Sequence, residues 1–139
     1  MDRITIQNRT GGPLVPYLVV RTTRGLARQA QPSLSVPAGG SYRVDPGGWN
    51  PVFYGEHGDQ RRGVLVEIGS RSDPPVLVST VYAYKVPPGQ AGENPTLQPR
   101  TAGRFPLQVG PTTEAVTIAV LPGFVVRYTE HGAAAAAGA

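Results

Sequence analysis

The chain has 139 residues, no cysteine, a formal net charge of +4 and a sequence pI of about 9.9. This length suits one domain with its own core, and the missing thiols exclude both disulfides and a zinc site built from thiolates. The first residues lack the charged and apolar regions of a secretory signal, and no apolar run is long enough to span a membrane. We therefore expect a soluble protein, cytoplasmic or on a virion surface.

Short runs of alternating or β-branched residues follow one another along the chain, separated by turns rich in glycine and proline. Strands are predicted first at 4–7 and 14–23, and a loop at 24–31, where too few helix-forming residues follow one another to nucleate a helix. The turn at 37–40 predicts a hairpin between 33–36 and 41–44. Further strands are predicted at 52–54, 64–68, 76–86, 105–109, 115–121 and 124–129.

No segment carries an apolar stripe of helical period, so any helix is expected to be limited to a turn or two near 24–31. About nine short strands with closely spaced turns predict an all-β fold, an antiparallel β-sandwich or barrel of jelly-roll-like type. We expect a single β domain over 1–130 and an alanine-rich tail over 131–139. The predicted core residues are Ile4, Ile6, Leu18, Val20, Leu34, Val36, Val64, Val66, Ile68, Val78, Val116, Ile118, Val120 and Val126.

The segment 87–104 stands out because its prolines and glycines disfavour both helix and strand. An irregular segment of this length inside a compact domain is commonly functional. We predict an extended arm that lies on a neighbouring subunit, anchored by an aliphatic side chain and by arginines that bond the partner's carboxylates or carbonyls. The residues assigned to this arm are Pro87, Pro88, Pro95, Leu97, Pro99, Arg100 and Arg104.

A second candidate surface joins an aromatic group to a polar loop and would suit a ligand or a partner. Its residues are Trp49, Asn50, Tyr54, Glu56, His57 and Asp59. A tryptophan that plugs one end of the sandwich and a solvated hairpin tip explain the same residues more simply. The chain has two histidines and no cysteine, too few soft ligands for a transition-metal site, so we expect no metal and no cofactor.

Catalysis is not favoured, because the sequence has no nucleophile elbow, no phosphate-binding glycine motif and no cysteine nucleophile. Binding to nucleic acid is not favoured either, because the arginines are spread along the chain instead of clustered. Folding could still gather them onto one face.

These observations favour a structural role over an enzymatic one. We expect a homo-oligomeric coat module, most simply a trimer, that decorates a larger protein shell such as a bacteriophage capsid. This step rests on analogy, since a fold does not fix a function. A carbohydrate-binding, lectin-like sandwich is the alternative, and a nucleic-acid-binding β-barrel is a further one.

Overall fold

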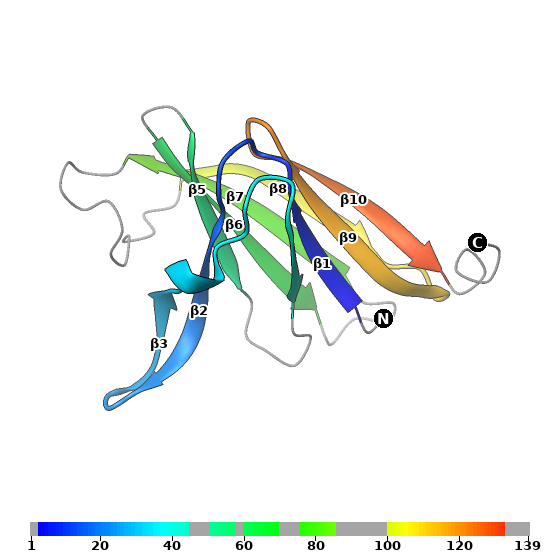
Figure 1. Cartoon of the computed structure of the whole chain (residues 1–139). Helices are drawn as coiled ribbons and strands as arrows, with labels where there is room; N and C mark the ends of the chain where they lie inside the picture. Colours follow the sequence, from blue (N-terminus) through cyan, green and yellow to red (C-terminus); the bar gives the residue numbers. More distant parts are fainter. Residues whose placement is uncertain (1–2, 45–50, 58–59, 70–75, 86–99, 133–139) are drawn as a thin grey trace.

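The computed structural model describes residues 3–44, 51–57, 60–69, 76–85 and 100–132. Within these ranges the chain forms two β-sheets and one short 3-10 turn, η1 (Pro32–Leu34). The two sheets are separate, so the fold is an all-β sandwich and not a closed barrel, which confirms the predicted fold class. Figure 1 shows the arrangement of the strands.

The smaller sheet has four strands in the order β10-β9-β1-β4. β1 runs parallel to β9, whereas the other neighbouring pairs in this sheet are antiparallel. The bounds of these strands are β1 (Arg3–Asn8), β4 (Ser41–Val44), β9 (Thr113–Leu121) and β10 (Val125–Gly132).

The larger sheet has six strands in the order β3-β2-β5-β6-β7-β8, and all neighbours in it are antiparallel. The bounds of these strands are β2 (Val15–Thr22), β3 (Gly25–Ala30), β5 (Val52–His57), β6 (Gln60–Gly69), β7 (Val76–Lys85) and β8 (Arg100–Gln108).

The core lies between the two sheets, where alternate residues of each strand turn inward. Phe53 is fully buried there and meets the Tyr42 ring edge to face, with centroids 5.3 Å apart. Nine of the predicted core residues are buried: Ile4, Ile6, Val36, Val64, Val66, Val116, Ile118, Val120 and Val126.

Four of the remaining core predictions were wrong. Leu34 lies in η1 and is 47% exposed, and Leu18 and Val20 are only partly buried. In β7 the predicted face was one residue out of register, because Leu77 turns inward and Val78 turns outward. The side chain of Ile68 is not among those the structure describes.

A hydrogen-bonded tyrosine ties the two sheets together. Tyr128 of β10 accepts a hydrogen bond from the Ser79 amide of β7 at 3.0 Å and donates one to the Phe105 carbonyl of β8. Ser79 and Phe105 face each other in the β7–β8 ladder, so the hydroxyl bridges two neighbouring strands of the opposite sheet. Burial raises the Tyr128 pKa, although the hydrogen bonds with Ser79 oppose that shift.

Three local predictions in the first third of the chain were wrong. The segment predicted as a loop contains β3, because a tight turn brings it alongside β2. The segment 33–36, predicted as a strand, begins inside η1, where Pro32 suits the first helical position and Ser35 Oγ donates to the Pro32 carbonyl at 2.6 Å. The predicted hairpin is also absent, because Val36 forms a bridge with Leu14, while β4 pairs with β1.

Residues 100–104, predicted as the end of the irregular arm, belong to β8 and pair with β7. Gly103 does not interrupt this strand. A Cβ at Gly103 would lie 2.9 Å from the Phe105 ring, so glycine is the residue that lets the ring lie over the strand. Near the C-terminus, β10 continues through His131 and Gly132, two residues into the segment predicted as an alanine-rich tail.

Candidate interaction surface

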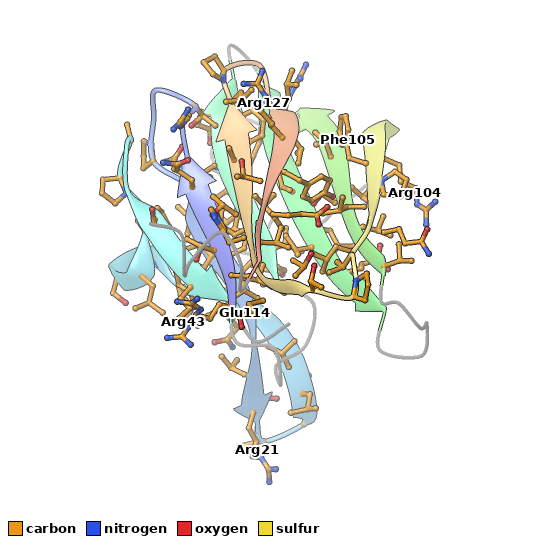
Figure 2. All side chains as sticks on the ribbon, turned by 90° about the vertical axis from the view of Figure 1, so that its right-hand side faces the viewer. Arg21, Arg43, Arg104, Phe105, Glu114 and Arg127 are labelled. Atoms are coloured by element: carbon orange, nitrogen blue, oxygen red, sulfur yellow. The ribbon has the colours of Figure 1, made fainter. Side chains whose placement is uncertain are left out.

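The β2–β3 hairpin projects from the sandwich. Only Val15, Pro16 and Tyr17 of β2 pair with β5, and from Leu18 to Thr22 the strand pairs with β3 alone. We call residues 18–29 the projecting ribbon. Figure 1 shows it leaving the body of the molecule, and Figure 2 places Arg21 at its far end.

The sequence of the ribbon explains its shape. Its valines favour strand, and Gly25, at φ +112°, adopts a conformation that other residues rarely reach. Thr22 closes the turn by donating from Oγ1 to the Gly25 carbonyl at 2.8 Å. At the base, the Gln31 amide donates to the Pro16 carbonyl at 2.8 Å. Because the amide and carbonyl of a strand residue point to the same side, Pro16 removes no bond to β5.

The ribbon exposes apolar side chains over an unpaired strand edge. Leu26 is 56% exposed, and Leu18, Val19 and Val20 are only partly buried. Among the described strands, β3 has a neighbour on one side only. A two-stranded hairpin is at best marginally stable in water on its own, and an open edge invites another chain. This combination is typical of a surface that a partner covers.

The ribbon is also basic. Arg21 and Arg24 are exposed, and Arg28 belongs to β3 opposite Val19. The sequence contains no acidic residue between Asp2 and Asp45, so no carboxylate of the ribbon itself balances these charges.

The predicted ligand patch is brought together only in part. Arg61 binds Oε1 of Glu56 through Nε at 2.9 Å and Nη2 at 2.8 Å, and its guanidinium lies 4.8 Å from the centroid of the Tyr54 ring. Nη1 of Arg61 is buried without a hydrogen-bond partner among the described residues.

Tyr54 is only 5% exposed, so its ring cannot serve as a platform for a sugar, contrary to the predicted use of this residue. Burial raises its pKa, and the Arg61 charge opposes that shift. The remaining patch residues cannot be placed relative to Tyr54 and Glu56. Trp49, Asn50 and Asp59 lie outside the described residues, and the side chain of His57 is not described.

The residues assigned to the arm do not form one site in the described part of the chain. Pro87, Pro88, Pro95, Leu97 and Pro99 lie outside it. Arg100 and Arg104 were wrongly placed in an irregular segment, because both belong to β8. Arg104 is exposed on this edge strand, opposite Thr80 of β7.

The sequence prediction missed the projecting ribbon because 24–31 has weak strand propensity. The available signal was the turn at 22–25, with its threonine and glycine after a valine-rich run.

Among the described residues, no group of three or more histidine, cysteine, aspartate or glutamate side chains could hold a metal ion. In the same part of the chain, no helix is long and apolar enough to cross a membrane. Comparison with protein-family models, curated proteins and solved structures found no match.

Proposed function

We propose that this protein is a non-enzymatic assembly module that forms a homo-oligomer and coats a larger protein shell, such as a bacteriophage capsid. The observation that carries the proposal is the projecting ribbon, which exposes Leu26 near its tip and whose β2 residues from Leu18 to Thr22 pair with β3 alone.

Assembly would stabilise the ribbon in two ways. Burying a leucine such as Leu26 contributes about 1.5–3 kcal/mol, and the partly exposed aliphatic residues of β2 add to this. The open edge of β3 can also receive a strand of a neighbour, which satisfies its free amides and carbonyls. Both gains are available only when a second chain covers the ribbon.

The position of the ribbon favours a ring. A ribbon that projects from one end of a molecule and contacts a different surface of the next copy makes a head-to-tail interface, which closes into a cyclic oligomer when the rotation allows. A trimer is the smallest such ring. Its repeated faces would then suit attachment to the repeating surface of a shell.

The test compares two substitutions at exposed apolar residues. Leu26→Glu places a charge on the projecting ribbon, and Val125→Glu places the same charge on β10, where Val125 is 52% exposed. Neither side chain belongs to the core, so both variants should fold. Light scattering should show the oligomer for the intact chain and for Val125→Glu, and a monomer for Leu26→Glu. An unchanged mass for Leu26→Glu would refute the role of the ribbon.

A further inference from the structure

The outer face of the four-stranded sheet gathers arginines that are far apart in the sequence. Ile4 and Ile6 of β1 turn into the core, so Arg3 and Thr5 turn outward. Residues paired across neighbouring strands point to the same side of the sheet, so the outward-facing side extends over β4, β1, β9 and β10. We call this side the cationic face.

One row of this face crosses all four strands. Arg43 of β4 lies opposite Thr5 of β1, Thr5 opposite Thr117 of β9, and Thr117 opposite Thr129 of β10. With strands about 4.8 Å apart, this row is roughly 14 Å wide. Arg43 and Thr129 are exposed, whereas Thr5 and Thr117 are partly buried. The row therefore presents hydroxyl groups between a guanidinium and the open edge of the sheet.

Two further arginines and a histidine lie on either side of that row. Arg127 of β10 is two residues along the strand from Thr129, a step of about 7 Å, and Arg3 of β1 is two residues from Thr5. His131 of β10 approaches Thr117, with its Nε2 3.0 Å from the threonine Oγ1. Arg3 and Arg127 are exposed. The labelled Arg43 and Arg127 can be located in Figure 2.

No carboxylate is present among the described residues of the cationic face. Glu114 and Glu130 alternate with outward-facing residues, so they belong to the core side of β9 and β10, beyond the buried positions. Glu130 is also hydrogen-bonded to Thr113 at 2.8 Å. Within the described residues the face therefore carries positive charge without a carboxylate beside it, and it should attract a polyanion.

The side chains of the face indicate which kind of partner it would bind: a protein, single-stranded nucleic acid or duplex nucleic acid. The middle of a protein–protein interface is enriched in aromatic residues, methionine and arginine, and single-stranded nucleic acid is held by stacking on aromatic rings. The described residues of the cationic face include no phenylalanine, tyrosine or tryptophan, and Ala115 and Ala119 leave its middle flat. Arginine, serine, threonine and glutamine are the side chains that contact phosphates of duplex DNA.

We propose that the cationic face binds the phosphate backbone of duplex nucleic acid without sequence preference. This inference is independent of the assembly proposal, because it concerns the opposite sheet from the projecting ribbon. Each arginine that contacts a phosphate releases condensed counterions, so affinity should fall as salt rises.

The experiment measures binding of a fluorescent DNA duplex by anisotropy over a series of salt concentrations. The test variant is Arg43→Gln with Arg127→Gln, and the matched control is Arg21→Gln with Arg104→Gln, which removes two exposed arginines from the other sheet. The two double variants have the same net charge, so a general field effect would weaken both alike. Urea denaturation checks that both variants fold as the intact chain does, and light scattering gives the mass of each, because Arg21 lies on the projecting ribbon.

For the test variant, the slope of log affinity against log salt should become shallower by about 1.8, because two phosphate contacts are lost. The control should keep the slope of the intact chain. No binding by the intact protein at low salt, or an equal loss in both variants, would overturn the inference. Binding to heparin or poly-glutamate but not to the duplex would also overturn it, and would assign the face to an acidic polysaccharide or an acidic protein.

Discussion

Removing one hydroxyl group from the interface between the sheets should weaken the whole fold. The substitution Tyr128→Phe keeps the ring and deletes the group that bridges the Ser79 amide and the Phe105 carbonyl. It also removes the contact between Oη and Ser79 Oγ at 2.8 Å. Because each buried polar backbone group left without a partner costs about 1–3 kcal/mol, we expect a loss of about 2–3 kcal/mol in the free energy of unfolding.

Urea denaturation followed by circular dichroism would measure this loss. In thermal unfolding the same change should lower the Tm by roughly 6–15 °C for a chain of this size. The matched control is Tyr42→Phe, because the Tyr42 ring packs on the core while its hydroxyl has no hydrogen bond to a described residue. A change below about 0.5 kcal/mol for Tyr128→Phe would show that the β7–β8 ladder closes without the hydroxyl, and would refute the bridging role.

Three further predictions concern stability. The pKa of Tyr128 is raised above 10.0 in the folded protein, so the stability that this raised pKa contributes is complete below pH 10 and is lost as the pH rises through the folded pKa. The urea midpoint should therefore fall under alkaline conditions, and it should fall less steeply in Tyr128→Phe. Asn8→Ala should cost about 2–4 kcal/mol in urea denaturation, because its buried amide donates to the Gly12 and Val36 carbonyls. Phe53→Ala should cost about 3–5 kcal/mol by the same assay, and a loss under 1 kcal/mol would contradict its central place in the core.

Most strands were predictable from the sequence because their side chains alternate and their turns contain glycine and proline. β6 and β9 illustrate this, because every second side chain over part of each strand is an aliphatic residue buried in the core. β3 was not predictable in this way. Its arginine and glutamine residues have little strand propensity, and the strand exists because the turn at Gly25 places it against β2.

The candidate surfaces were harder to predict, because they depend on which strands become neighbours. Arg3, Arg43 and Arg127 are distant in the sequence and share a face only because β4 pairs with β1, β1 with β9, and β9 with β10. Strand order of this kind is not encoded in local periodicity. Similarly, Tyr54 was predicted to belong to an exposed patch, whereas in the structure its ring is buried beside the Arg61 guanidinium.

The position of β8 also changes how the predicted arm should be tested. A deletion that extends to 102 would remove the first residues of that strand, which pair with β7. A deletion confined to 89–97 avoids all described strands. We expect it to leave the fold intact and to weaken assembly if the arm contacts a neighbour; an unchanged mass would remove the arm from the interface.

The most direct test of the assembly proposal is the molar mass of the intact chain in solution, measured by light scattering over a range of concentrations. The proposal predicts a discrete oligomer, expected to be a trimer, that dissociates to monomers when Leu26 on the projecting ribbon is replaced by glutamate. A monomer at every concentration for the intact chain would contradict it.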